Sequence, residues 1–245
     1  MPEADGTFDP YKILVSELML QQTQVGRVIP KYHEFLAKFP NVRTLAQASL
    51  GDVLVVWSGL GYNRRAKFLW QAAQKIQNDF AGTFPNSFEQ LVTLPGVGKN
   101  TAGAILAYAY NQPIVFIETN IRSVYIHHFF NDQTDISDKA IAEIVELTLP
   151  KENAREWYWS LMDYGTHLKQ TVGNTARASK GYKKQSAFHG SQRQIRGAVI
   201  RCLGQGPKSE TALLEQIADD RTPQVLDELV NEQMIARQDD QYKLA

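Results

Sequence analysis

The chain has 245 residues, of which 43% are hydrophobic and 21% charged, with 26 lysines and arginines against 26 aspartates and glutamates. This composition is that of a folded globular protein and excludes wholesale disorder or a fibrous repeat. Its single cysteine, Cys202, excludes internal disulfides and any metal cluster held only by cysteines. Because no apolar run reaches the roughly 20 residues of a membrane span and the start is acidic, we expect a cytoplasmic protein, nucleoid-associated if bacterial, without membrane contact.

Charge is distributed unevenly along the chain. Residues 1–150 carry 12 basic and 14 acidic side chains, residues 164–209 carry nine basic ones and no acid, and residues 210–245 carry three basic and nine acidic ones. We call residues 164–209 the basic belt, because its charge is enough to neutralise several DNA phosphates. A solvated linker would have the same composition, so charge alone leaves both interpretations open. The basic residues of the belt are Lys169, Arg177, Lys180, Lys183, Lys184, Arg193, Arg196, Arg201 and Lys208.

Residues 1–170 are expected to form helix after helix, separated by short turns that contain glycine or proline. Ser87, with Gln90 three residues later, is a capping-box signal for one helix start. No alternating run is long enough to form a central sheet. The predicted helices cover residues 9–23, 30–39, 44–56, 65–80, 87–94, 99–110, 120–130, 138–149 and 154–168.

The last 55 residues predict a second, smaller unit. Helices are expected at 192–203, 210–217 and 223–234, followed by two short strands around Asp239 and Asp240, which is the pattern of a winged helix. Thr222 before Pro223 predicts an N-cap followed by a proline at the first helical position. The sequence therefore predicts an all-α core in residues 1–170, a small, polar, basic linker in 171–190, and a winged-helix-like α+β domain in 191–245.

The helix predicted at 223–234 contains Asp227, Glu228 and Glu232 and no base, which makes it a poor surface for a DNA groove. Any DNA contact of this domain is therefore expected from the 192–203 helix. An alternative role for the acidic domain is docking a protein. We expect the 223–234 helix to pack onto its own domain through Val225, Leu226, Leu229, Val230 and Met234.

The sharpest motif is LPGVGKNTAGAILAYAY at residues 94–110. It predicts two helices joined by Gly96, Val97 and Gly98, so that consecutive backbone N–H groups and Lys99 lie at the start of the second helix. The helix dipole favours an anion there, and nothing in the turn reads bases, so a DNA phosphate is the expected ligand. The alternative is an ordinary tight turn between helices.

Two carboxylates have positions suited to chemistry. Glu17 lies in a stretch that is apolar around most of a helical wheel, so we expect it in a low-dielectric environment that raises its pKa and lets it hold a proton. Glu118 precedes the helix predicted at 120–130, whose dipole would keep it ionised. Glu17 could instead be a rim carboxylate in water, and Glu118 could be a plain cap. Together they provide the acid and the anion that breaking a glycosidic bond requires.

Three motifs in order carry a family resemblance: LVSELMLQQTQVGRVIP at 14–30, WSGLGYNRRAKFL at 57–69 and LPGVGKNTAGAIL at 94–106. They resemble the helix-hairpin-helix DNA glycosylases over roughly residues 10–168. The resemblance is strongest to the subfamily that removes adenine opposite oxidised guanine. It implies a helix-hairpin-helix glycosylase core of two helical lobes. Against this family pattern, we expect the winged-helix-like domain to replace the C-terminal domain that recognises oxidised guanine, and we expect the helix that the family has before Pro10 to be missing.

The resemblance implies roles for individual residues. Glu17 matches the general acid that protonates the departing base, and Asn120 matches a site asparagine near the catalytic carboxylate. Side chains that fill the gap left by a flipped nucleotide offset its unstacking cost. The residues matched to that task are Gln21, Gln22 and Thr23, which insert at the vacated site, and Tyr62, which wedges beside the distorted pair. Arg64, Arg65 and Lys67 could touch the DNA backbone or simply be solvated.

Two catalytic positions differ from the family. Glu118 stands where the family has aspartate, and its extra methylene moves the carboxylate by more than about 1 Å, a misplacement that can cost about 10²-fold in rate. Asn100 stands in the pocket where related bifunctional enzymes hold a Schiff-base lysine. An amide cannot attack the sugar carbon, and Lys99 lies about 100° around the helix, so strand cleavage at abasic sites is not expected.

The family's iron–sulfur cysteines would align with Lys169, Ala176, Ser179 and Gln185, so neither this cluster nor another cofactor is expected. We expect basic side chains to make the phosphate contacts that the cluster loop makes in the family. The residues expected to do so are Lys169, Arg177, Lys180, Lys183, Lys184, Arg193 and Arg196.

The leading hypothesis from the sequence is a monomeric, monofunctional DNA glycosylase of base excision repair that acts on double-stranded DNA, with adenine as the first candidate base. One alternative is the same chemistry on uracil or thymine in a mismatch, or on a damaged purine. Another is a non-catalytic binder of distorted DNA, in which Glu118 no longer supports turnover.

Overall fold

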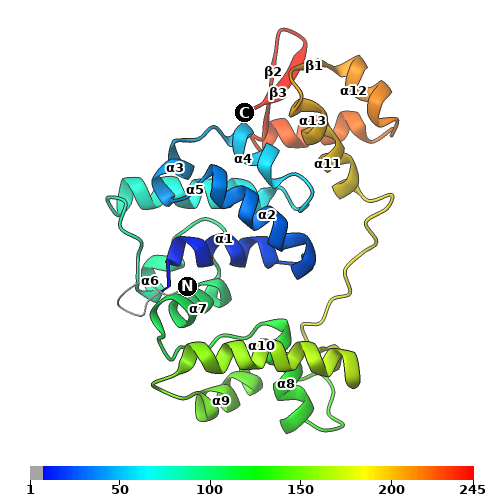
Figure 1. The fold of residues 1–245 in the computed structure, drawn as a ribbon. Coiled ribbons are helices and arrows are strands. Elements are labelled where there is room, and N and C mark those ends of the chain that lie inside the picture. The colour runs from blue at the N-terminus through cyan, green and yellow to red at the C-terminus, as the bar shows by residue number, and fades with distance from the viewer. Residues whose placement is uncertain (1–7) are drawn as a thin grey trace. The chain divides into compact units, whose positions relative to one another are not determined.

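The computed structural model describes residues 8–245, and its helices and strands are shown in Figure 1. The chain divides into two compact units. Unit 1 comprises residues up to Leu14, Pro85–Thr93 and Val97–Gln185, and unit 2 comprises Val15–Phe84, Leu94–Gly96 and Ser186–Ala245. The acidic start lies outside the described part, and so does the stretch in which the family's first helix is expected to be missing.

Unit 2 contains most of α1 (Pro10–Leu20), which crosses the boundary between the units after Leu14. The rest of unit 2 comes from both ends of the chain. Its remaining elements are α2 (Val25–Lys38), α3 (Val42–Gln47), α4 (Leu50–Trp57), α5 (Arg64–Asp79), α11 (Gln192–Leu203), β1 (Lys208–Ser209), α12 (Glu210–Ile217), α13 (Thr222–Asn231), β2 (Ile235–Gln238) and β3 (Gln241–Leu244).

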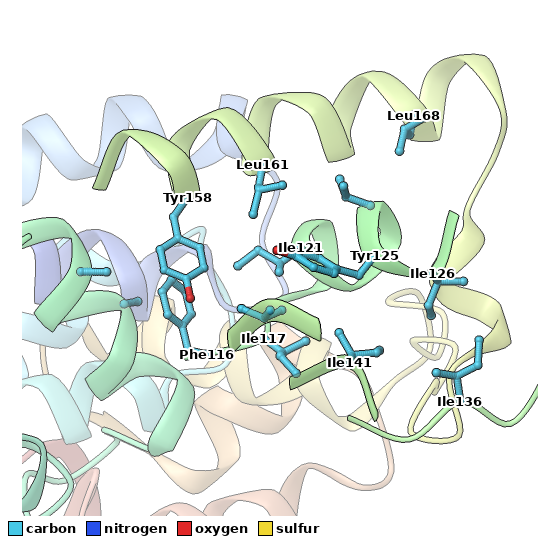
Figure 2. Close-up of a cluster of buried hydrophobic side chains, with 14 of the residues drawn as sticks. Phe116, Ile117, Ile121, Tyr125, Ile126, Ile136, Ile141, Tyr158, Leu161 and Leu168 are labelled. Atoms are coloured by element: carbon cyan, nitrogen blue, oxygen red, sulfur yellow. The ribbon is translucent and has the colours of Figure 1, made fainter. Parts of the chain in front are cut away.

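Unit 1 is built on two helices that pack against each other, α8 (Thr119–Phe129) and the longer α10 (Ala154–Thr171). Figure 2 shows the apolar side chains between them, among which Ile121, Tyr125 and Tyr158 are at most 1% exposed. Gly103 lets α7 approach this core, because a Cβ there would lie 2.7 Å from the Cβ of Phe116. The other elements of unit 1 are α6 (Phe88–Leu91), α7 (Lys99–Tyr110), α9 (Asp138–Thr148) and a 3₁₀ helix, η1 (Thr175–Ala178).

The helical fold class is confirmed, and several predicted elements have the expected bounds, including α7, α11 and α12. Others differ. Pro30 does not begin a helix but lies inside α2, which starts five residues earlier at Val25. The helix predicted at 44–56 is two helices, because the Ser49 hydroxyl accepts a hydrogen bond from the Asp52 amide and starts α4 anew.

The C-terminal elements follow the order expected of a winged helix, with a third strand that the sequence did not reveal. The sheet has the order β1-β3-β2, and both pairings are antiparallel. Thr222 is the first residue of α13 rather than its cap, and its hydroxyl donates to the Asp219 carbonyl at 2.7 Å. As expected, α13 packs by its apolar face, since Val225, Leu226, Leu229 and Met234 are 0% exposed; Val230 is half-buried.

Residues 191–245 do not form a separate compact unit, because they pack with residues 15–84 in unit 2. The Gly51 amide of α4 donates to the Ala245 carbonyl oxygen at 2.7 Å. A Cβ on Gly51 would lie 3.0 Å from the Cβ of Leu244, so the end of the sheet approaches α4 closely. None of the described helices is long and apolar enough to cross a membrane.

The first part of the segment predicted as a linker is ordered against unit 1. Ser179 is 6% exposed and forms a parallel bridge with Ile136, and the Lys180 amide donates to the Ile136 carbonyl at 2.9 Å. The Thr175 hydroxyl of η1 donates to the Ser123 carbonyl at 2.8 Å. Residues 180–190 are exposed throughout, so only this second part has the character of a linker.

Candidate active site

Glu17 lies in the C-terminal half of α1 and is half-buried. Its neighbours on the same face of the helix are Leu14, which is 1% exposed, and Leu20, which is 36% exposed. Elsewhere on the helix, Val15, Leu18 and Met19 are 0% exposed. The helix is therefore apolar around most of its circumference, as the sequence predicts, although it ends at Leu20 rather than near Thr23. This places a partly accessible carboxylate on a helix whose Val15, Leu18 and Met19 are buried in unit 2.

The loop after α1 contains Gln21, Gln22 and Thr23, and a buried arginine holds it in place. Nη1 of Arg65 donates to the carbonyl oxygens of Leu18 at 2.7 Å, Met19 at 2.9 Å and Gln21 at 2.5 Å. The last carbonyls of a helix lack partners within the helix, and a cation at a helix C-terminus is favoured by the helix dipole. Arg65 thus ends α1 and fixes the path of the loop.

Arg65 also joins that loop to the segment before α5. Its Nη2 donates to the Thr23 hydroxyl at 3.0 Å and to the carbonyls of Leu60 and Gly61, both at 3.2 Å. Burial lowers the pKa of Arg65 to about 10, which still leaves it protonated at neutral pH. The sequence predicted either a DNA backbone contact or a solvated side chain for Arg65, and both are wrong because it is 7% exposed.

Tyr62, the predicted wedge, lies in this same segment. Its backbone has φ +47°, in the left-handed region that bulky residues rarely adopt. Two guanidinium groups lie close to its ring, those of Arg65 at 5.3 Å and Arg193 at 4.9 Å from the ring centre, and its hydroxyl accepts a hydrogen bond from Arg193. Within unit 2 the structure therefore brings Tyr62 and the 21–23 loop together through one side chain, Arg65.

The glycine turn has the local conformation expected before a helix that binds an anion. Gly96 has φ +78°, and a Cβ there would lie 2.7 Å from the Cβ of Phe68, so glycine is required. Gly98 is the N-cap of α7 and provides no side-chain cap. Lys99 is exposed, and Val97 anchors the turn at 4% exposure. Because glycine has no side chain, the cap residue offers no side-chain acceptor to the first-turn N–H groups of α7.

Glu118 is the N-cap residue of α8, but its side chain makes no capping hydrogen bond. The segment before it is fixed by Asn100, the residue at the family's lysine position. Nδ2 of Asn100 donates to the Ile117 carbonyl at 2.9 Å, and the Ile117 amide donates to Oδ1 at 3.3 Å. Asn100 therefore positions the backbone that carries Glu118, a role that the sequence did not indicate.

Asn120 joins α8 to α10. Its Nδ2 donates to the Met162 carbonyl and the Thr166 hydroxyl, both at 3.2 Å, and its Oδ1 accepts a hydrogen bond from Lys169. A Cβ on Gly165 would lie 2.6 Å from the Asn120 carbonyl oxygen, so the two helices approach closely at this point. These contacts make Asn120 a structural clamp two residues from Glu118.

The residues of the basic belt belong to two different units. In unit 1, Arg177, Lys180, Lys183 and Lys184 are exposed, whereas Lys169 is half-buried on Asn120 and burial lowers its pKa. In unit 2, Arg193 and Arg196 are half-buried and bonded to protein groups. Of the belt residues predicted to bind phosphate, the four exposed ones in unit 1 are therefore those whose charges face solvent.

The residues at the family's cluster positions do not fit an iron–sulfur group. Ala176 is 1% exposed and offers no ligand atom, the Lys169 amine is bonded to Asn120, and Gln185 is exposed. Such clusters are held by thiolates. Cys202 lies elsewhere, on α11 in unit 2.

Comparison with known proteins agrees with the family resemblance. The family model for the HhH-GPD superfamily base excision DNA repair protein matches residues 15–151. An adenine DNA glycosylase of Buchnera aphidicola subsp. Baizongia pistaciae is 39% identical over 158 residues, which are 64% of this chain and 45% of that protein. An adenine DNA glycosylase of Mycobacterium tuberculosis is 32% identical over 225 residues, 83% of this chain and 73% of that protein.

Among solved structures, a thermostable thymine-DNA glycosylase aligns with a TM-score of 0.56 and 26% identity, covering 64% of this chain and 74% of that one. The chain spans about half the length of the Buchnera relative. The family model covers more than half of the present chain, and the resemblance inferred from its three motifs is confirmed. The chain belongs to the HhH-GPD superfamily of base excision DNA repair proteins.

Proposed function

We propose that this protein is a monofunctional DNA glycosylase that removes adenine from double-stranded DNA by hydrolysing its N-glycosidic bond. The observation that carries the proposal is Glu17, a half-buried carboxylate on an otherwise largely apolar helix, beside the buried Leu14 and the partly exposed Leu20. A protein that only bound DNA would have no need of a carboxylic acid at this place. The names of the similar adenine DNA glycosylases supply the candidate base.

In the proposed reaction Glu17 gives a proton to a ring nitrogen of the flipped adenine. The base then leaves with the electron pair of the glycosidic bond, and the sugar becomes an oxocarbenium-like cation. General acid catalysis of this kind contributes typically about 10² to 10⁴ in rate.

Glu118 is the proposed anion that stabilises this cation while water attacks the sugar carbon. Its place at the N-terminus of α8 favours the ionised carboxylate. Because its side chain is not used as a cap, the plain capping role considered from the sequence is not supported. The hydrogen bonds between Asn100 and Ile117 hold the backbone from which Glu118 projects.

The absence of strand cleavage remains part of the proposal. A lyase reaction of this family's type needs an amine that attacks the sugar carbon, and both ends of the Asn100 carboxamide are bonded to the Ile117 backbone. Borohydride trapping tests this, because a covalent protein–DNA adduct after reduction would contradict a monofunctional enzyme.

We further propose that DNA phosphates bind at the first turn of α7 and along the exposed belt residues of unit 1, namely Lys99, Arg177, Lys180, Lys183 and Lys184. A helix N-terminus provides oriented N–H groups for one phosphate, and each lysine that neutralises another adds to the salt dependence of binding. Arg196 is left out of this surface, because its guanidinium is paired within unit 2.

A second candidate is the removal of thymine from a mismatch. One observation favours it: a solved thymine-DNA glycosylase is 26% identical to this chain, and the match covers 64% of this chain. The chemistry would be similar, but a pyrimidine leaves more readily without prior protonation of the ring. Glu17 therefore argues for the purine.

Single-turnover incubation with a panel of duplexes would test the proposal. The panel carries adenine, thymine, uracil or a damaged purine opposite each partner, and hot alkali reveals abasic sites as strand breaks. We expect breaks first at adenine, and Glu17→Gln should lower the rate by about 10² or more while leaving duplex affinity intact. Tight binding without abasic sites on any duplex would exclude an enzyme, and an equally active Glu17→Gln variant would exclude the proposed acid.

A further inference from the structure

Tyr62 is held by a residue 131 positions away in the chain, Arg193 of α11. Arg193 donates a hydrogen bond to the Tyr62 hydroxyl, and the centre of its guanidinium lies 4.9 Å from the centre of the ring. The Arg65 guanidinium lies 5.3 Å from the same ring. The aromatic side chain is thus contacted by two cations, and one of them comes from the C-terminal part of unit 2.

Arg193 is itself fixed in this orientation. Its other terminal nitrogen, Nη2, donates to the Ser186 carbonyl at 2.8 Å, the Ser186 hydroxyl at 3.2 Å and the Ala187 carbonyl at 3.3 Å. The planar guanidinium therefore uses one edge for the protein backbone and the other for Tyr62. A lysine, with a single ammonium group, cannot make both sets of contacts at once.

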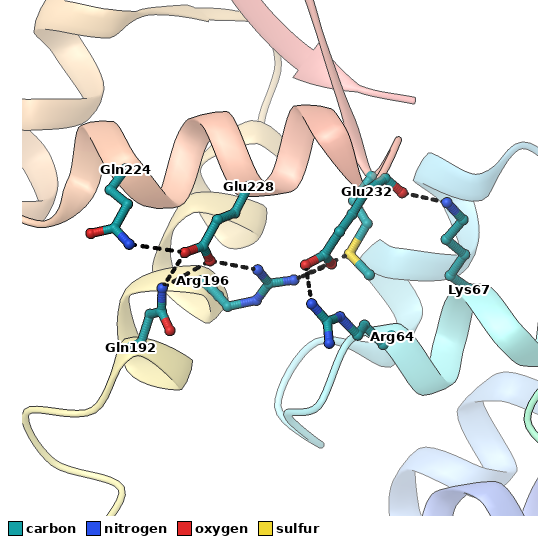
Figure 3. Close-up of polar contacts among 8 residues, drawn as sticks. Arg64, Lys67, Gln192, Arg196, Gln224, Glu228 and Glu232 are labelled. Carbon is teal, nitrogen blue, oxygen red and sulfur yellow. Dashed lines mark hydrogen bonds and ion pairs between the residues drawn. The ribbon is translucent and has the colours of Figure 1, made fainter.

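A second set of contacts holds the residues that follow Tyr62. Figure 3 shows Glu232, the residue that follows α13, accepting hydrogen bonds from Arg64 of α5 and Arg196 of α11, while its backbone carbonyl accepts one from Lys67. Glu228 accepts from Arg196 at 3.4 Å and from Gln192 at 2.7 Å. Hence α11 and α13 together hold the first turn of α5, directly after Tyr62.

The backbone at Tyr62 needs such support. Its φ of +47° is unfavourable for an aromatic residue, and such conformations persist where the surroundings determine them. On the side that precedes Tyr62, the Trp57 indole donates to the Gly61 carbonyl at 3.1 Å. The C-terminal part supplies Arg193, whose guanidinium contacts the ring and its hydroxyl. Contacts from two segments of the chain, residues 57–67 and residues 186–232, therefore fix the position of Tyr62.

We propose that Arg193 is a positioning residue for base flipping: it holds Tyr62 in the orientation with which that ring enters the DNA, and residues 186–245 serve as its brace. This inference rests on the proposed function. It differs from the sequence prediction that Arg193 binds a phosphate directly. It also gives α11 and α13 a role in catalysis that needs no base-reading contact by either helix.

The two roles of Arg193 predict different results for conservative variants. A direct phosphate contact depends on charge, so Arg193→Lys should behave like wild type and Arg193→Ala should reduce the salt dependence of binding. A positioning role depends on the guanidinium shape, so Arg193→Lys and Arg193→Ala should both slow flipping. The same two variants should also leave the salt dependence unchanged.

A double-mutant cycle in the whole protein would test the proposal. Excision is measured under single turnover at saturating enzyme, and flipping is read from the fluorescence of 2-aminopurine next to the target base. We expect Arg193→Ala and Arg193→Lys each to lower the flipping and excision rates by roughly tenfold, which corresponds to about 1.4 kcal/mol. In a protein that already carries Tyr62→Ala, the Arg193 substitutions should lower these rates less than about twofold further, because the effects of substitutions at two residues in contact do not add.

Arg201→Ala is the matched control, since it removes one positive charge from an exposed position of the same helix. Its effect should be independent of Tyr62. Additive effects of Arg193 and Tyr62, or full rescue by Arg193→Lys, would overturn the positioning role. A wild-type protein that flips 2-aminopurine-labelled DNA but excises no base would instead overturn the glycosylase proposal alone, because the cycle can still be read from fluorescence.

Discussion

Asn100 and Ile117 exchange two hydrogen bonds, in which the side-chain amide donates to the Ile117 carbonyl and the Ile117 amide donates to the side-chain oxygen. The carboxamide is matched to this place because it offers one donor and one acceptor at the same time. The pair ties the start of α7 to the residue before Glu118.

Replacing the donor alone should break this match. We expect Asn100→Asp to lower the free energy of unfolding by about 1 to 3 kcal/mol at neutral pH, because a carboxylate would face the Ile117 carbonyl oxygen. Urea denaturation measures the change. Asn63→Asp is a suitable control, since Asn63 precedes α5 and its side chain makes no capping hydrogen bond. Equal destabilisation by the two substitutions would contradict a specific role for Asn100.

The length of the Glu118 side chain should matter for catalysis. Glu118→Gln keeps the size but removes the charge, and we expect the single-turnover rate to fall by about 10² to 10³. Glu118→Asp keeps the charge and restores the shorter side chain of the family, which removes the displacement of more than about 1 Å, so we expect the rate to rise by up to about 10². Duplex affinity, measured in parallel, should change little for either variant. A Gln variant with the wild-type rate would show that Glu118 is not the stabilising anion.

The close approach of α8 and α10 should make Gly165 intolerant of any side chain. Gly165→Ala would place a Cβ 2.6 Å from the Asn120 carbonyl oxygen, and we expect a loss of at least about 2 kcal/mol in the free energy of unfolding. Gly26→Ala in α2 is the matched control, because a Cβ there meets nothing within 4 Å. That change should be neutral or stabilising by up to about 1 kcal/mol. The prediction fails if both variants unfold at the wild-type urea concentration.

Glu232 should make the stability of unit 2 depend on pH. Burial raises the pKa of its carboxyl, but hydrogen bonds from Arg64 and Arg196 outweigh burial and leave the pKa below 4.5. A carboxyl whose pKa is lower in the folded state stabilises the protein above the unfolded pKa, and this contribution is lost as pH falls through the folded pKa. Melting temperature measured between pH 7 and pH 3 should therefore fall less steeply in Glu232→Gln than in wild type. Glu215→Gln, at an exposed position of α12, should keep the wild-type slope.

The basic belt should divide into residues that bind DNA and residues that stabilise the fold. Removing Lys183 and Lys184 together should reduce the slope of log affinity against log salt concentration by about 2 and leave the free energy of unfolding unchanged. Arg196→Ala should leave the slope unchanged and lower the free energy of unfolding by about 1 to 3 kcal/mol, because Glu228 and Glu232 would lose a shared partner. Salt titrations and urea denaturation of the same proteins distinguish the two groups.

The sequence was sufficient wherever local patterns decide the structure. The bounds of α7 follow from the glycine turn before it and a long run of small and apolar residues, and those of α12 follow from the Ser209 cap, whose hydroxyl accepts from the Ala212 amide. The prediction that a helix starts at Pro30 is wrong, although proline prefers the first turn of a helix. Burial of Val28 and Phe35, one on each side of Pro30, outweighs that preference and keeps α2 continuous.

What the sequence could not provide are contacts between residues far apart in the chain. Arg65 looks like one member of a basic pair, and nothing near it indicates that its partners are carbonyls 44 to 47 residues earlier. The same holds for Arg196, whose charge was assigned to DNA but is paired with carboxylates more than 30 residues later. Charge counts locate cations along a sequence, but only the fold shows which of them have protein partners.

Five chain crossings join the two units, at the positions after Leu14, Phe84, Thr93, Gly96 and Gln185. The last crossing lies within the exposed stretch 180–190, where a protease would cut most readily. Such a cut would not release a domain, because residues 186–245 would stay bound to residues 15–84 through the contacts of Gly51, Tyr62 and Arg64. A nicked chain would therefore behave as one particle in solution and come apart only on denaturation, so its mass on a denaturing gel and its size in solution would disagree.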